Sequence, residues 1–206
     1  GRIDQAGSYE DGYSLNTPGY YAVDVEHVGM ETVEPGQPYS QTQVSDPKIT
    51  ETIKSADIRG ADPNLVKAII QAESSGNPNA IHVDKDGVAS YGLMQVRPDT
   101  AKRYDPALEG LTNAQIGEKL KDPNYNMKVG TAYLQDLSNK YGSDLNKVVA
   151  AYNGGPGANG ASRDCPGSSR WQCQWDNAAH TKPNTGYAVT RSYVQRVNNY
   201  YSQLSK

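Results

Sequence analysis

Several absences in the sequence exclude whole classes of protein. Phenylalanine is absent, histidine occurs three times and cysteine twice among 206 residues. No apolar run comes near the roughly 20 residues that a membrane helix needs, so we expect no membrane span. His27, His82 and His180 are scattered without a motif, which gives no support to Ser-His-Asp catalysis and no histidine at metal-ligand spacing.

The charge of the chain is low and unevenly distributed. The net charge is −3, which gives no general affinity for nucleic acid. Residues 1–48 hold 8 acidic and 2 basic residues, whereas residues 49–206 hold 15 acidic and 18 basic ones. Tyrosine occurs 15 times, and these rings suit either a sugar-facing surface or the rim of a core.

The two cysteines lie close together in a loop rich in Gly and Ser. Cys165 and Cys173 are too few for a structural zinc site, which takes four ligands. We therefore expect a local disulfide, and with it an oxidising compartment; two free thiols are the alternative.

The chain divides into an extension and a helical domain. Residues 1–45 contain one leucine, Leu15, and one isoleucine, Ile3, which is too little branched apolar surface for a core. We therefore expect a loop-rich or disordered arm with at most a short strand at 21–25. Residues 46–206 are expected to form a compact, mainly α-helical domain. Helix starts are predicted at Asp46-Pro47, Asp62-Pro63, Pro98, Asp122-Pro123, Asp144 and about Tyr187. A long loop is expected at 154–186.

One carboxylate falls on the buried face of a predicted helix. Glu73 follows Val66, Ile69 and Ile70 at helical spacing and sits in the last turn. Burial and the negative end of the helix dipole would both raise its pKa above the usual value of about 4.3. A glutamic acid held protonated in this way is suited to general acid catalysis. The alternative is a glutamate that bends out to solvent.

Three further clusters carry polar groups in apolar surroundings. Gln95 interrupts the apolar segment 91–96, Asn153 follows Tyr152 at the end of a helix, and Tyr193 points inward on the last helix. Each of these taken alone is more often structural than functional.

Together the motifs resemble a known family. They are Glu73-Ser74, then Gly92-Leu93-Met94-Gln95, then Ala151-Tyr152-Asn153, then Tyr193-Val194. In this order they are similar to the signature of the soluble lytic transglycosylases, which have the goose-type lysozyme fold. The resemblance covers about residues 47–206 and implies a mainly α, lysozyme-like α+β domain with a substrate cleft.

The resemblance also implies a reaction. Lytic transglycosylases cleave the β-1,4 bond between N-acetylmuramic acid and N-acetylglucosamine in peptidoglycan and leave a 1,6-anhydro end, with no metal or organic cofactor. The resemblance implies that Glu73 acts first as the general acid and then as the base, and that Tyr193 orients it. Ser74 would support the sugar or Glu73, and Gly92 would let the backbone approach the glycan. Met94 and Gln95 would line the cleft, and Tyr152 and Asn153 would contact the sugars.

The expected partner is the peptidoglycan glycan strand, bound by a monomer. The protein would act in the periplasm or cell envelope after export, or from a phage virion. Residues 189–191 read Val-Thr-Arg, where the family often has Glu-Thr-Arg. Trp171 and Trp175 in the long loop either stack on sugars or pack the loop.

Three alternatives remain open. A goose-type lysozyme would use water and a second carboxylate, for which Asp84 and Asp86 are candidates; an exposed turn is the plainer interpretation of both. A non-catalytic glycan-binding module would not need Glu73. A cell-wall-remodelling component of a secretion, conjugation or phage assembly would use the acidic extension for docking.

Overall fold

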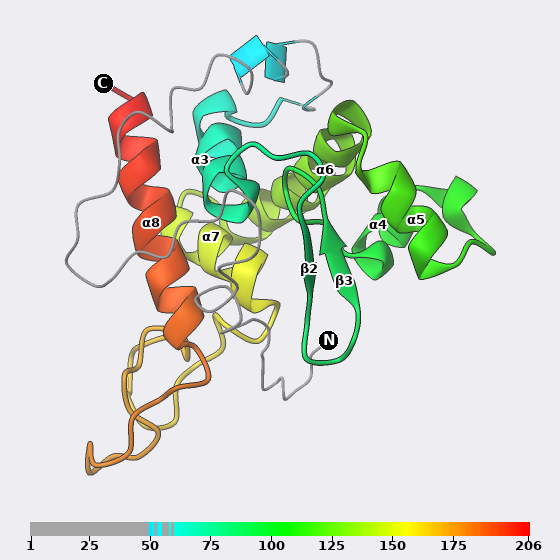
Figure 1. The fold of residues 1–206 in the computed structure, drawn as a ribbon. Helices are drawn as coiled ribbons and strands as arrows, with labels where there is room; N and C mark the ends of the chain where they lie inside the picture. The colour runs from blue at the N-terminus through cyan, green and yellow to red at the C-terminus, as the bar shows by residue number, and fades with distance from the viewer. Residues whose placement is uncertain (1–49, 52, 55–57, 59) are drawn as a thin grey trace. The chain divides into compact units, whose positions relative to one another are not determined.

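Helices dominate the part of the chain that the computed structural model describes, residues 50, 51, 53, 54, 58 and 60–206. The elements are α3 (Pro63–Ser74), β2 (Ile81–Val83), β3 (Ala89–Tyr91), α4 (Pro98–Tyr104), the 3₁₀ turn η1 (Pro106–Leu108), α5 (Asn113–Leu120), α6 (Pro123–Tyr141), α7 (Leu145–Gly154) and α8 (Ala188–Leu204), as Figure 1 shows. This confirms the mainly helical fold. The arm 1–45, the strand at 21–25 and most of the helix expected before Gly60 lie outside the described residues.

The predicted helix starts are confirmed where the structure describes them. Asp62 caps α3 by accepting a hydrogen bond from the amide of Asn64 (3.0 Å), and Pro63 occupies the first turn. Asp144 caps α7 in the same way, with the amide of Lys147 as donor. Each side chain satisfies an amide that the helix itself leaves unpaired.

Helix α5, strands β2 and β3 and the 3₁₀ turn η1 were not predicted. Helix α5 begins at a capping box in which Thr112 and Gln115 exchange side-chain and backbone hydrogen bonds. Strands β2 and β3 form an antiparallel hairpin with Ile81 opposite Tyr91. The segment that follows β3 is a tight turn, because Tyr91 and Val96 exchange both backbone hydrogen bonds. The predicted loop at 154–186 is confirmed: it carries no helix or strand after the end of α7.

The chain forms two compact units. The described part of the first unit runs to residue 140 and includes 196–206; that of the second is 141–195. In the first unit the end of α8 is fastened to α3, because Asn64 donates to the carbonyl of Leu204 (3.2 Å) and the hydroxyl of Tyr201 donates to Asp62. None of the described helices combines the length and the apolar character needed to cross a bilayer.

Candidate active site

Glu73 is buried in the first unit. It is 2% exposed and lies on the face of α3 that also buries Val66, Ile69 and Ile70. The periodicity argument is therefore confirmed, and the alternative of a glutamate bent out to solvent is wrong. The residue stands one position before the end of the helix, so its carboxyl group lies near the negative end of the helix dipole.

Ser74 ties the end of α3 to the loop of residues 92–95. Its hydroxyl donates to the carbonyl of Leu93 (2.8 Å) and accepts from the amide of Gly76 (3.2 Å). The helix stops directly afterwards, because Ser75 has a left-handed backbone with φ of 51°. Ser74 is fully buried, so within this structure it fixes Glu73 relative to the loop.

The loop of residues 92–95 is closely packed, and two glycines, one in the loop and one facing it, leave no room for a Cβ atom. Gly92 has a φ of +77°, and a Cβ atom there would overlap the side chain of Asn126 and the carbonyl of Leu120. Met94 has no exposed surface, and a Cβ atom on Gly130 of α6 would come 2.6 Å from its sulfur. Met94 thus supports the loop from within the core and offers no exposed wall.

Gln95 is buried, with an unusual backbone conformation. Its φ of 49° is unusual for a residue with a side chain. The side-chain amide donates to the carbonyls of Ala80 and Gly92, both at 3.0 Å. Among the described residues, its buried Oε1 atom has no hydrogen-bond partner. Both donors are occupied, so the side chain can offer a ligand only an acceptor.

Asn126 of α6 organises the loop, and motif reasoning gave it no role in the site. Its Oδ1 accepts from the amide of Met94 (2.8 Å), and its Nδ2 donates to the carbonyls of Tyr91 and Leu120 (2.8 Å each). The side chain is fully buried. Its position next to Met127 on the buried face of α6 could have indicated this role, because a buried amide side chain needs hydrogen-bond partners.

The second unit holds the remaining predicted residues. Tyr152, half-buried, and Asn153, 9% exposed, lie in the last turn of α7. The Oδ1 atom of Asn153 accepts from the hydroxyl of Thr190 (2.9 Å), and its buried Nδ2 has no partner among the described residues. Tyr193, three positions after Thr190 on α8, has no exposed surface, so its expected inward position is confirmed. Asn153 can offer a ligand only a donor.

Arg191 anchors the long loop to α8. Its guanidinium donates to the carbonyls of Trp171 and Cys173 (3.1 Å each) and to that of Asn184 (2.6 Å). Burial lowers the pKa of Arg191. In the Val-Thr-Arg segment, therefore, Thr190 positions Asn153 and Arg191 holds the loop.

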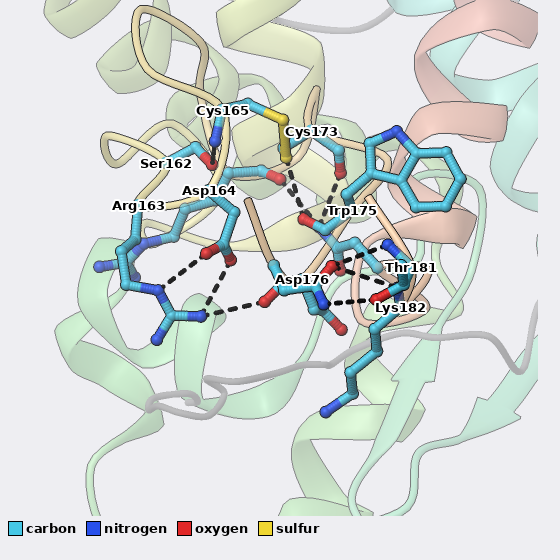
Figure 2. Close-up of polar contacts among 12 residues, drawn as sticks. Ser162, Arg163, Asp164, Cys165, Cys173, Trp175, Asp176, Thr181 and Lys182 are labelled. Carbon is cyan, nitrogen blue, oxygen red and sulfur yellow. Dashed lines mark hydrogen bonds and ion pairs between the residues drawn. A yellow bond between two sulfur atoms is a disulfide. The ribbon is translucent and has the colours of Figure 1, made fainter. Parts of the chain in front are cut away.

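The loop carries the expected disulfide, between Cys165 and Cys173 (Figure 2). Trp171 is 7% exposed and donates to Asn159 (3.0 Å), so it packs the loop. Trp175 is stacked on His180, with ring centroids 5.4 Å apart. Nearby, Arg163 binds Asp164 through two hydrogen bonds, also drawn in Figure 2.

Asp84 and Asp86 are both held by Arg97. The guanidinium pairs with Asp84 and, at 2.8 Å, with Asp86. Burial alone would lower the pKa of Arg97, but the hydrogen bond to Asp86 and the charges of Asp99, Asp84 and Asp86 raise it above its usual range. The clamp joins the turn of the β2–β3 hairpin to the start of α4. No group of three or more His, Cys, Asp or Glu side chains in the described part of the chain is arranged to hold a metal ion.

Comparisons with known proteins identify the family of this chain. The profile of the Transglycosylase SLT domain matches residues 51–170, which is more than half of the chain. The chain belongs to the transglycosylase SLT domain family. The SLT match includes Glu73, the 92–95 loop and Asn153, and it ends before Tyr193.

Among the relatives, the transglycosylase of Enterobacteria phage PRD1 is 41% identical over 106 residues, covering 51% of this chain and 34% of that protein. Membrane-bound lytic murein transglycosylase C of Photorhabdus laumondii is 38% identical over 119 residues, covering 54% and 32%. The SLT chain described here thus spans about a third of the length of these relatives. An inactive Glu-to-Gln mutant of the lytic transglycosylase Slt from Pseudomonas aeruginosa has a TM-score of 0.51 at 28% identity, covering 77% of this chain and 24% of that one.

Proposed function

We propose that this SLT domain is a peptidoglycan lytic transglycosylase that cleaves the β-1,4 bond between N-acetylmuramic acid and N-acetylglucosamine. The observation that carries the proposal is the buried carboxyl of Glu73, at the end of α3 and fastened through Ser74 to the 92–95 loop. The names of the relatives, lytic murein transglycosylases among them, support the same reaction. Glu73 is the only carboxylate in the matched motifs.

Glu73 acts first as an acid and then as a base. Burial and the helix C-terminus both disfavour an ionised carboxyl at this position, and the proposed reaction starts from the protonated acid. Its proton goes to the bridging oxygen as the bond from that oxygen to C1 of the muramyl sugar breaks. The resulting carboxylate accepts the proton of the C6 hydroxyl as that oxygen bonds to C1. Glu73 thus regains the proton that it donated, and the reaction needs neither water nor a second carboxylate.

The surrounding side chains position the substrate and the acid. Gln95 offers an acceptor and Asn153 a donor, and these match the N–H and C=O groups of the acetamido substituents on both sugars. In this proposal Tyr152 contacts a sugar ring, and Tyr193 keeps the orienting role that the family resemblance implies. Gly92 and Met94 contribute by shaping and supporting the loop.

The clamp on Asp84 and Asp86 favours lytic over hydrolytic cleavage. A goose-type lysozyme needs a group that activates water, and both of these carboxylates are paired with Arg97. Analysis of the products separates the two reactions, because a lytic enzyme leaves an anhydro end and a hydrolase a reducing end.

The relatives also bear on location and organisation. One is named membrane-bound and another comes from a phage, so we place this protein in the periplasm or cell envelope, or in a phage virion. We propose residues 46–206 as the catalytic domain, acting as a monomer. Residues 1–45 form an extension that serves docking if the domain works within a secretion, conjugation or virion assembly.

The test is the substitution Glu73→Gln. The amide keeps the size of the side chain but cannot deliver a proton, so turnover of purified cell-wall sacculi should fall by at least about 10²–10⁴-fold. Stability should not decrease, because the neutral amide has no charge to desolvate. Glu109→Gln, an exposed site after η1, is the matched control. Mass spectrometry of the released muropeptides should show anhydro ends from the wild type. Turnover by Glu73→Gln close to that of Glu109→Gln would overturn the proposal.

A further inference from the structure

A polar pocket lies in the first unit, and none of the residues that line it belongs to the proposed site. It has a volume of about 510 Å³ and is formed by residues of α4 and α6 and the start of η1. Ligand pockets usually measure about 300–1,000 Å³, so this one has room for a small molecule or a short peptide. Its polar lining includes Arg103, Tyr104, Asp105, Tyr125, Lys128 and Asp136.

The acidic side chains of the pocket are paired with tyrosines. Tyr104 donates to Oδ2 of Asp136 (2.6 Å), and Tyr125 donates to Asp105. Burial and then the bond to Asp136 raise the pKa of Tyr104, while the hydrogen bond from Tyr125 is the main reason why the pKa of Asp105 is lowered. The tyrosines therefore remain donors and Asp105 remains ionised. Asp105 also accepts from the amide of Ala107, so both of its oxygens are occupied.

The basic side chains of the pocket are not neutralised in this way. The guanidinium of Arg103 lies over the rings of Tyr104 and Tyr133, at 5.8 and 5.3 Å from their centroids. Within the described residues, no carboxylate forms an ion pair with Arg103 or Lys128. Stacking on two rings holds the planar guanidinium in place and leaves its N–H groups for a ligand.

We propose that this pocket binds a short peptide that carries both a carboxylate and an ammonium group, namely the stem peptide of peptidoglycan. Arg103 and Lys128 take the carboxylate, since paired N–H donors suit that group. Asp136 takes the ammonium group through Oδ1, the oxygen that Tyr104 does not occupy. A peptide that carries both charges can pair with the two cations and with Asp136, whereas a neutral sugar can form no ion pair with either, which is why the peptide and not the glycan is assigned here. The assignment of the peptide rests on the proposed function, because it takes peptidoglycan as the substrate.

Calorimetric titration of the full chain with a soluble stem tetrapeptide tests the proposal. Glu73→Gln serves as the parent protein, so that the disaccharide titrated for comparison is not cleaved. Arg103→Gln should raise the dissociation constant about 10-fold, the loss expected for one charge-assisted hydrogen bond. Lys102→Gln removes the same charge from the neighbouring exposed position of α4, which is outside the pocket, and should change it less than about 2-fold.

The outcomes separate this proposal from the proposed function. Absence of peptide binding, equal effects of the two substitutions, or Arg103-dependent binding of a peptide-free disaccharide would each overturn the pocket assignment. Peptide binding that depends on Arg103 supports it even if the wild type fails to cleave sacculi, a result that would refute only the proposed reaction. Circular dichroism of both variants checks that each is folded.

Discussion

Asn126 gives the sharpest test of how the 92–95 loop is held. Asn126→Ala removes three buried hydrogen bonds, to Met94, Tyr91 and Leu120. The carbonyl of Tyr91 keeps its bond from the amide of Val96, so two groups lose the partner that this side chain supplies. At about 1–3 kcal/mol for each of the two groups left unpaired, the free energy of unfolding should fall by about 2–6 kcal/mol.

Thermal and urea unfolding measure this loss directly. For a chain of this size, about 1 kcal/mol corresponds to about 2–4 °C, so the melting temperature should fall by roughly 10 °C. Asn124→Ala, an exposed position two residues earlier in α6, is the matched control and should change stability by less than about 0.5 kcal/mol. Turnover of sacculi below the melting temperature should also fall more for Asn126→Ala, because the loop bears Gln95. Equal stability of the two variants would refute the claim that Asn126 holds the loop.

Three further predictions concern the second unit and the extension. Thr190→Val should reduce turnover about 10-fold because Asn153 loses its orienting donor, and it should lower the free energy of unfolding by about 1–3 kcal/mol because a buried acceptor is left unpaired. Thr190→Ser should retain activity, and equal kinetics of the two variants would remove this role. Reduction of the bond between Cys165 and Cys173 should cost at most about 2–3 kcal/mol, measured by urea unfolding with and without reductant; rapid labelling of both thiols in untreated protein would show that the bond is absent. A protein lacking residues 1–45 should cleave purified peptidoglycan at the wild-type rate, and a truncated protein that is folded but inactive would place the extension in the site.

Much of the fold follows from local signals in the sequence. Asp62 and Asp144 cap helices as predicted because each precedes an apolar helical stripe. The burial of Glu73 also follows, since residues three, four and seven positions apart share a helix face. In these cases short-range geometry and burial favour the same structure.

The missed features depend on contacts between residues far apart in the chain. Asn126 acts on a loop about 30 residues earlier, and Thr190 acts on Asn153, 37 positions before it. Periodicity places such a polar residue on a helix face but does not name its partner. Helix α5 is a different case, since Thr112 and Gln115 carry a recognisable capping box that could have predicted the start of the helix.

The two candidate amides show why these distant contacts matter for function. An amide side chain offers both a donor and an acceptor, so its identity alone does not say which of them a ligand meets. For Gln95 the backbone occupies the donors, and for Asn153 the hydroxyl of Thr190 occupies the acceptor. The surroundings thus convert two similar side chains into opposite partners, one acceptor and one donor. Under the proposed function, recognition of the N–H and C=O groups of N-acetylated sugars would therefore depend on the residues that hold each amide as much as on the amides themselves.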